Sequence, residues 1–524
     1  MKEMISLNID GNTVKAEKGS NLLQVARDNG IDIPGLCYHR KLSPTGACRL
    51  CVVKIEGQRG LLMACTVAVE DGMKVTAFDD ELEELRKHTV DYLLAEHNDE
   101  TDGSYHDELR ELTLRYGLEE QADRSYPNIS REQGYGVDDT SPVLTYDASK
   151  CIKCFRCIKA CYEVQGKNVL AFSMRGIKSY IIAGFDHWAE SECDGCGECI
   201  QLCPTGAIVE KPHRQRIKID EIDRKVVTTC PYCGVGCQIE LIVKDNKILR
   251  VNGVEGVLPN DGRLCVKGRF GYDYVNHAER LTMPLIKRNG KFEEASWDEA
   301  MDLVADRLGS IKKEFGPGAL AGYASAKCTN EDNYLFQKFV RIVFGNNNID
   351  YCTRLCHAST VTAMLRSIGD GAGSNSIEDF ETTDCLFVTG NNIIETHPVT
   401  ATYVKAGKRR GNRIIVCDPK WTPLVKYADI WLQPRLGTDV ALLNGMIRQI
   451  IHDGDIDEKF ISERVKGGMV AFEELKLLVE KYKPRLVEDI TSVPADKIIE
   501  AARMYARADT AMIATGMGLS QQVT

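Results

Sequence analysis

The first 80 residues alternate short apolar runs with glycine turns. The segments MISLNI, TVKAE, CVVKIE and KVTAF have the alternation of half-buried strands, whereas residues 20–29 have the apolar spacing of a helix. This pattern predicts a small mixed sheet with one helix. Residues 81–135 are acidic with apolar positions at helical spacing, which predicts either two helices packed against a neighbouring domain or a solvated connector.

The second half of the chain has a different pattern. From residue 284 onward, GALAGYAS, CLFVTG and RIIVCD predict buried strands, and NEDNYLFQKFVRIVFG, HPVTATYVKAGKRRG and ALLNGMIRQIIHDG predict helices between them. Strands that alternate with helices form a parallel sheet with helices on both faces. The predicted fold class is multidomain, α+β and then α/β, with domains at 1–80, 81–140, 141–212, 222–284 and 285–524 and a charged linker at 210–225.

Composition narrows the function classes. The chain has 524 residues, 43% of them hydrophobic, and a net charge of −10 without a long Lys/Arg block, so it offers no electrostatic surface for nucleic acid. Its N-terminus has no basic region followed by an apolar stretch, and no apolar run approaches the roughly 18 residues of a membrane span. We expect a cytoplasmic protein without nucleic-acid or membrane partners.

Cysteine usage points to metal. Disulfides are rare in a reducing cytoplasm, so most of the 21 cysteines are better explained as metal ligands. Sixteen of them fall into four groups of four before residue 270, and five are scattered through the second half.

The first group is the set Cys37, Cys48, Cys51 and Cys65. Two loop cysteines separated by two residues, with two more from flanking segments, are able to surround a [2Fe-2S] cluster, and a zinc knuckle is the alternative. The spacing is similar to that of the ferredoxin-like domain at the start of respiratory complex I large subunits and iron-only hydrogenases.

The second and third groups repeat one spacing, C-x2-C-x2-C-x3-C, in CIKCFRCIKAC and CDGCGECIQLCP. In two-cluster bacterial ferredoxins the fourth cysteine of each such run ligates the other cluster. We therefore expect two [4Fe-4S] clusters, with zinc or chance as the weaker alternatives. The first would be held by Cys151, Cys154, Cys157 and Cys203, and the second by Cys193, Cys196, Cys199 and Cys161.

The fourth group is CPYCGVGC with a distant LCVKG, which contains Cys230, Cys233, Cys237 and Cys265. With Lys267 two residues after the last cysteine, it resembles the N-terminal [4Fe-4S] domain of the molybdopterin-dependent oxidoreductases. The resemblance implies that Lys267 lies between cluster and pterin, whereas an ordinary surface lysine is the alternative.

The second half of the chain contains a Cys-His pair that is a candidate catalytic site. The segment NNNIDYCTRLCHASTV resembles the active-site stretch of formate dehydrogenases, in which a selenocysteine or cysteine precedes histidine, and the matching residues are Cys356 and His357. A thiolate suits a molybdenum or tungsten centre, and an imidazole accepts protons near neutral pH. We interpret Cys328, Cys352, Cys385 and Cys417 as core thiols.

Polar residues that follow the predicted strands match the family's contacts with its pterin dinucleotide, although each is also typical of an ordinary turn. They are Gly390, Asn391 and Glu395, then Asp418, then Gly437, Thr438 and Asp439.

The combined motifs resemble the catalytic (alpha) subunit of cytoplasmic formate dehydrogenases linked to NAD(P) or hydrogenase. This resemblance implies ferredoxin-like iron–sulfur domains before a molybdopterin-oxidoreductase α/β domain, with one [2Fe-2S], three [4Fe-4S] and a molybdenum or tungsten bis-molybdopterin guanine dinucleotide. Formate and CO2 would interconvert, with electrons passing through the clusters to a flavin- and NAD(P)-binding diaphorase-type subunit, a hydrogenase subunit or ferredoxin. The alternative is a non-catalytic electron conduit.

Two departures from the family are visible. Its usual His/Cys cluster motif is absent, because no cysteine lies between Cys65 and Cys151 beside His97, so we expect four clusters. The family also continues well beyond GMGLSQQVT, so we expect the catalytic domain to be incomplete. GMGLSQ lacks the third glycine and acidic partner of a dinucleotide fingerprint, which assigns any nicotinamide chemistry to a partner subunit.

Overall fold

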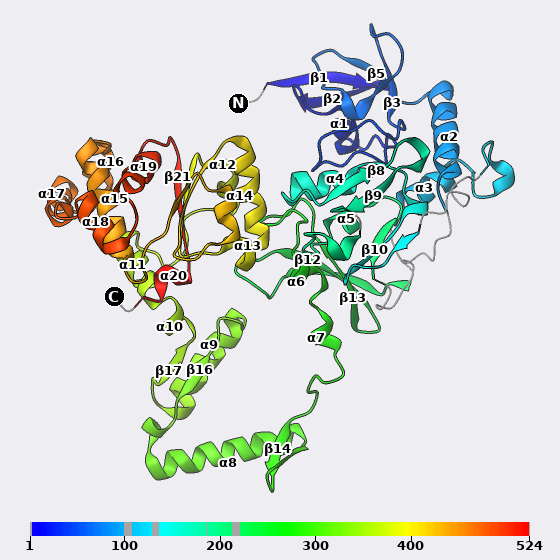
Figure 1. The fold of residues 1–524 in the computed structure, drawn as a ribbon. Helices are drawn as coiled ribbons and strands as arrows, with labels where there is room; N and C mark the ends of the chain where they lie inside the picture. Colours follow the sequence, from blue (N-terminus) through cyan, green and yellow to red (C-terminus); the bar gives the residue numbers. More distant parts are fainter. Residues whose placement is uncertain (1–2, 99–106, 128–135, 186, 212–220, 523–524) are drawn as a thin grey trace. The chain divides into compact units, whose positions relative to one another are not determined.

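A computed structural model describes residues 3–98, 107–127, 136–185, 187–211 and 221–522 (Figure 1). These residues form two compact units. The N-terminal unit contains Met1–Tyr232 and Gly236–Asp273, and the C-terminal unit contains Cys233–Val235 and Tyr274–Thr524. Parts of the predicted connector (99–106 and 128–135) and most of the predicted linker (212–220) lie outside the described residues.

The N-terminal sheet has the strand order β2-β1-β5-β3-β4, in which β1 and β5 are parallel and the other pairs antiparallel. Asn21 caps the helix by accepting a hydrogen bond from the backbone N–H of Gln24. The predicted mixed sheet and helix are confirmed. The elements are β1 (Met4–Ile9), β2 (Asn12–Glu17), α1 (Leu22–Asp28), β3 (Val52–Ile55), β4 (Leu62–Met63) and β5 (Lys74–Thr76).

The acidic segment contains α2 (Asp80–Ala95) and α3 (Glu108–Arg115), whose N-termini are capped by the side chains of Asp79 and Asp107. Their apolar faces are buried in one core with residues of the neighbouring domains. Of the two interpretations of this segment, the packed helices are therefore correct. The core contains Leu36, Cys37, Cys48, Leu50, Val90, Leu94, Leu109, Leu112, Leu118 and Cys154.

The rest of the N-terminal unit consists of small sheets and short helices. The two repeated cysteine runs fold alike, because α4 and α5 each begin after a left-handed residue, Phe155 (φ 69°) and Gly197 (φ 71°). The strands are β6 (Val137–Asp138), β7 (Leu144–Asp147), β8 (Leu170–Ser173), β9 (Tyr180–Ala183), β10 (Ile208–Glu210), β11 (Arg224–Thr229), β12 (Gln238–Lys244) and β13 (Lys247–Gly253). The helices are α4 (Arg156–Lys159), α5 (Glu198–Gln201), α6 (Val266–Phe270) and α7 (Asp273–Asn276).

The C-terminal unit is built on a parallel sheet of order β20-β19-β18-β21. Alternate residues of β18 and β19 face α14 on one side and α15, α18 and α19 on the other, so the predicted parallel sheet with helices on both faces is confirmed. The elements are β18 (Cys385–Thr389), α14 (Pro398–Arg410), β19 (Arg413–Cys417), β20 (Ile430–Leu432), α15 (Asp439–Asp453), α16 (Glu458–Arg464), α17 (Gly468–Val479), α18 (Pro484–Thr491), α19 (Ala495–Ala506), β21 (Ala511–Thr515) and α20 (Met517–Ser520).

The segment before this sheet is less enclosed. The buried strand predicted in GALAGYAS is wrong: β16 has three residues and pairs only with β17, so Tyr323 is 86% exposed. Among the described residues no helix is long and apolar enough to cross a membrane. The elements are β14 (Leu285–Arg288), β15 (Lys291–Glu294), α8 (Trp297–Phe315), β16 (Gly322–Ala324), α9 (Asn330–Phe339), β17 (Ile349–Tyr351), α10 (Thr353–Cys356), α11 (Ala358–Ser367), α12 (Asp379–Thr382) and α13 (Ile393–Thr396).

A network of charged side chains joins three domains of the N-terminal unit. Lys41, from the loop after Cys37, pairs with Glu198 at 2.8 Å and lies 3.6 Å from Glu255. His39 lies 3.2 Å from Glu255. Burial raises the pKa of Glu255, but the hydrogen bond to His39 and the charge of Lys41 outweigh it and hold that pKa at about 2. The carboxylate is thus ionised at neutral pH and binds the domains together.

Arg86 attaches α2 to the N-terminal sheet. Its side chain is fully buried and donates hydrogen bonds to the carbonyl oxygens of Leu50 (3.1 Å), Val52 (2.7 Å) and Ala77 (2.7 Å). Its charge pairs with Glu83. One side chain therefore satisfies three backbone acceptors that water does not reach.

We expect Arg86→Met to destabilise the N-terminal unit by about 3–5 kcal/mol, because it leaves these acceptors and a carboxylate without their partner. Hydrogen exchange of the α2 amides should become at least about 100-fold faster. Lys87→Met, at the next and exposed position of α2, is the matched control and should change stability by less than ~0.5 kcal/mol. Equal exchange rates in the two variants would contradict this role of Arg86.

Candidate functional site

The first thiol group lies inside the N-terminal domain. Cys37, Cys48, Cys51 and Cys65 are all buried, although they come from three separate segments. The hydrogen bonds that the Cys48 and Cys65 thiols donate lower the pKa of Cys37 to about 2. A hydrogen bond from Cys65 likewise lowers the pKa of Cys51. Hydrogen bonds between thiols thus link Cys37 to Cys48 and Cys65, and Cys65 to Cys51, so the three segments bring the four thiols together.

The second thiol group lines a small apolar cavity. Cys151, Cys154 and Cys157 of the first run face Cys203 of the second run across it, with Ile181 and other apolar residues as walls. Burial raises the pKa of Cys151 to about 11, so this thiol keeps its proton until a metal displaces it.

In the third thiol group, one cysteine of the first run lies with three cysteines of the second run. Burial raises the pKa of Cys199, and the neighbouring thiols that add to this effect are Cys196, Cys193 and Cys161. Cys161 belongs to the first run and the other three to the second. The structure thus crosses the two runs, as the ferredoxin spacing predicts.

The fourth thiol group lies around α6. The backbone N–H of Cys230 donates to the carbonyl of Cys237 at 2.8 Å, and Cys265 immediately precedes α6. A Cβ on Gly268 would lie 3.5 Å from the Cys230 sulfur, so α6 borders this thiol. Cys233 is half-buried on the turn between Cys230 and Cys237, and Lys267 is exposed on α6.

The donor sets fit multi-iron clusters. An iron–sulfur cluster spreads four thiolates over several irons. Buried thiols with apolar walls are donors that suit such clusters.

In the C-terminal unit, Cys356 ends α10 and His357 lies at the start of α11, both half-buried. The Cys356 sulfur lies 3.0 Å from the sulfur of Met517 at the start of α20. The Ser359 hydroxyl donates to the carbonyl of Ser520 at 2.6 Å. The Cys-His turn is thus fixed against the segment that follows β21.

Two glycine turns meet at the carboxyl ends of β18 and β21. Gly390 and Asn391 follow β18, and the N–H of Gly518 donates to the Gly390 carbonyl at 3.0 Å. A Cβ on Gly390, whose φ is 57°, would lie 2.5 Å from the backbone nitrogen of Leu519. Because β19 lies on one side of β18 and β21 on the other, the strand order reverses here, which is where open α/β sheets bind ligands.

The remaining predicted contacts lie around the same edge of the sheet. Asp418 follows β19, Thr438 and Asp439 begin α15, and Gly437 before them has a φ of 76°. Burial raises the pKa of Asp439, and the charge of Asp418 adds to it, so the two carboxylates are neighbours. Glu395, on α13, is exposed and accepts a hydrogen bond from Asn392 at 2.6 Å.

Two cysteines of the C-terminal unit were predicted wrongly, and one methionine of the site was not predicted. Cys328 and Cys352 are exposed, so their interpretation as core thiols is wrong, whereas Cys385 and Cys417 are buried as predicted. The exposed pair lies in the weakly enclosed segment before the sheet. Met517 was missed, although a glycine turn after an apolar strand signals a site even when it is no dinucleotide fingerprint.

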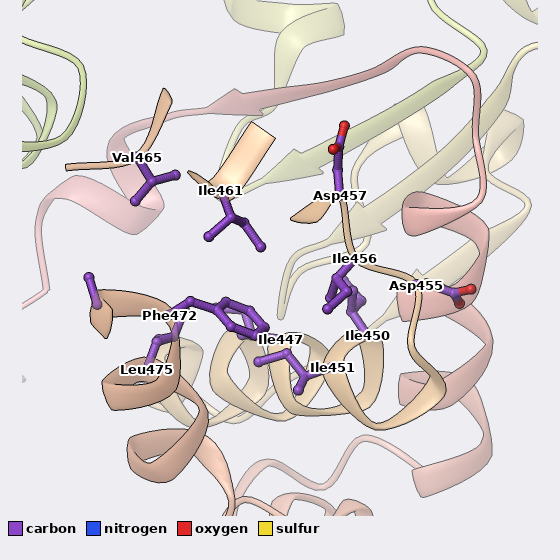
Figure 2. Close-up of a pocket in the computed structure, with 11 residues that line it drawn as sticks. Ile447, Ile450, Ile451, Asp455, Ile456, Asp457, Ile461, Val465, Phe472 and Leu475 are labelled. Carbon is purple, nitrogen blue, oxygen red and sulfur yellow. The ribbon is translucent and has the colours of Figure 1, made fainter. Parts of the chain in front are cut away.

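An apolar pocket of the C-terminal unit is lined by none of these residues. Figure 2 shows it among α15, α16 and α17, with a volume of about 370 Å³. Its lining includes Ile447, Ile451, Ile461 and Phe472, and none of the candidate site residues. A packing defect between helices explains this pocket as well as a ligand does.

Four family models match the chain in order. They are "2Fe-2S iron-sulfur cluster binding domain" at residues 2–79, "NADH-quinone oxidoreductase subunit 3, ferredoxin-like domain" at 141–209, "Molybdopterin oxidoreductase Fe4S4 domain" at 223–277 and "Molybdopterin oxidoreductase" at 280–523. The expected fold class, ferredoxin-like iron–sulfur domains followed by a molybdopterin-oxidoreductase domain, is confirmed.

Curated relatives share the whole of this chain. "Probable oxidoreductase YjgC" of Bacillus subtilis (strain 168) is 32% identical, with 99% of this chain and 56% of that protein covered. "Putative formate dehydrogenase SAS2201" of Staphylococcus aureus (strain MSSA476) is 31% identical, with 100% and 56% covered. This chain therefore spans about half the length of these relatives.

A solved structure is similar as well. Acetylene hydratase from Pelobacter acetylenicus superposes with a TM-score of 0.51 and 28% identity, over 57% of this chain and 41% of that one. The order of the matched domains and the four thiol groups within them lead to one conclusion. The chain belongs to the molybdopterin oxidoreductase family and carries a 2Fe-2S domain and 4Fe-4S domains ahead of its molybdopterin domain.

Proposed function

We propose that this chain catalyses the reversible oxidation of formate to CO2. The observation that carries the proposal is the position of Cys356 and His357 beside Met517, at the strand-order reversal of the parallel sheet. Relatives that are named formate dehydrogenase and are about one-third identical support the choice of substrate.

The thiol groups would hold the clusters in this proposal. The first binds a [2Fe-2S] cluster, and each of the other three binds a [4Fe-4S] cluster. The cavity between Cys151 and Cys203 and the thiol contacts of Cys199 support the crossed assignment of the two ferredoxin runs. Lys267 would face the pterin from the fourth cluster.

The second half would hold molybdenum or tungsten in a bis-molybdopterin guanine dinucleotide. Cys356 supplies a thiolate to the metal, which when bound accepts the two electrons of formate. His357 takes up the proton. The polar groups at the edge of the sheet bind the dinucleotide: Gly390, Asn391, Glu395, Asp418, Gly437, Thr438 and Asp439. The carboxylates among them suit the N–H groups of a guanine.

Electrons would leave through the four clusters to a partner in the cytoplasm. A diaphorase-type subunit with flavin and NAD(P), a hydrogenase subunit and ferredoxin are the candidate partners. The alternative function is a non-catalytic electron conduit. Metal analysis of the isolated complex separates the two, because molybdenum or tungsten with pterin supports the enzyme and iron alone supports the conduit.

The first test is iron content. One [2Fe-2S] and three [4Fe-4S] clusters require about 14 iron atoms per chain. Colorimetric iron analysis against protein concentration measures this directly. A value near 18 would reveal a fifth cluster, and the interpretation that no cluster binds near His97 would then be wrong.

The second test addresses the metal ligand. In the complete enzyme, Cys356→Ser should abolish formate turnover and leave the four iron–sulfur signals in electron paramagnetic resonance (EPR) spectra unchanged, because a serine oxygen is a poor match for a soft metal site. His357→Ala should slow turnover by about 10²- to 10⁴-fold without metal loss, as expected when a proton acceptor is removed.

Cys352→Ser is the matched control for this test. Cys352 lies one helical turn before Cys356, but its side chain is exposed. The control should keep near-normal turnover and change stability by less than ~0.5 kcal/mol. If Cys352→Ser were inactive while Cys356→Ser turned over normally, the ligand would have been assigned to the wrong cysteine.

A further inference from the structure

Arg269 lies where the third and fourth thiol groups meet. It lies on α6, the helix that begins directly after Cys265. Its Nε donates a hydrogen bond of 2.8 Å to the carbonyl oxygen of Cys196. Its side chain fills the space beside Gly197, where any Cβ would overlap with it. A glycine at that position is thus required for the approach. The backbone of Arg269 thus belongs to the helix that borders the fourth group, and its guanidinium borders the third group.

The charge of Arg269 is buried without a carboxylate. The residue is 2% exposed, and its Nη2 has no hydrogen-bond partner in the described part of the chain. Glu198, in the same loop as Cys196, pairs with Lys41 instead. Burying an unpaired cation costs several kcal/mol, a cost that an anion bound beside it would offset.

We propose that Arg269 is a positioning residue for electron transfer, whose guanidinium neutralises the anionic cluster at the third thiol group and raises its reduction potential. This inference rests on the proposed function, because it requires a [4Fe-4S] cluster at that group. Reduction adds one electron to a cluster, so a nearby cation and a hydrogen bond to sulfur favour the reduced form. Arg269 supplies the charge and, from Nη2, the donor.

Arg156 is the informative contrast. It is buried like Arg269 and lies in the run of the second thiol group, where it donates to the carbonyl of Tyr38, next to Cys37, at 2.8 Å. However, both of its Nη atoms bind the Glu108 carboxylate. The charge of Arg156 is compensated by protein, so of these two arginines it is Arg269 that would find its opposite charge on a cluster.

The test is an EPR-monitored redox titration of the holoenzyme with Arg269→Gln, Arg269→Lys and, as the control, Arg224→Gln. Arg224 is exposed on β11. In Arg269→Gln, the ratio of reduced to oxidised cluster at a fixed potential should fall about tenfold for one [4Fe-4S] signal, that of the cluster at the third thiol group, which equals about 59 mV for one electron. The [2Fe-2S] signal should not shift. Arg269→Lys keeps the charge and should shift by less than half as much, and Arg224→Gln should shift no signal.

Every other result of this titration either overturns or supports the proposal. Unchanged potentials in Arg269→Gln with full iron content would overturn it, as would an equal shift in Arg269→Lys. If Arg269→Gln lost iron, retention of iron in Arg269→Lys would support the role of charge, and loss in both would show a packing role and overturn it. Formate turnover is not the readout, so missing clusters in the unmodified enzyme would refute the proposed function, whereas four signals with unshifted potentials would refute only Arg269.

Discussion

The N-terminal unit depends on the enclosure of cysteine thiols within its apolar cores. Thiols and aliphatic side chains share three cores of this region, so these cores are not separate from the proposed cluster sites. Domains of this size bury little apolar surface, and those of other proteins often use metals to complete their stability. Because burial keeps thiols such as Cys151 protonated, binding iron must release protons. Cluster insertion and consolidation of the core are therefore one coupled process.

In the C-terminal unit, the parallel sheet brings segments that are distant in sequence to one edge. All four strands of the sheet run parallel, so the residues after each strand meet at the same edge. The close approach of Gly390 to Gly518 leaves no room for a side chain there and holds two of these turns against each other. The Cys356 turn contacts α20 and is therefore carried by the same sheet. The sheet itself is largely apolar, and the polar candidate residues lie after its strands.

Local signals predicted much of this and missed what depends on packing. Cysteine spacing predicted the crossing of Cys161 and Cys203, because the ferredoxin repeat fixes it. Alternation of apolar residues predicted the parallel sheet, but it failed for β16, whose apolar letters lie in a segment that packs against little of the chain described here. Cys328 and Cys352 lie in the same segment and are exposed for the same reason. Met517 and Arg269 were missed because their roles arise from contacts between segments far apart in sequence.

Charged side chains connect three of the thiol groups. Lys41 lies within the first group, four residues after Cys37, Glu198 lies within the third, and Glu255 precedes the last cysteine of the fourth. Lys41 contacts both carboxylates and is nearly inaccessible to water, so the Coulombic attraction is only weakly screened. Electron transfer between clusters slows steeply as their separation grows, whereas apolar packing tolerates small sliding movements. Directional ion pairs such as the buried Lys41–Glu198 pair restrict such sliding, so in the proposed function the Lys41 network would help to keep the distances between clusters constant.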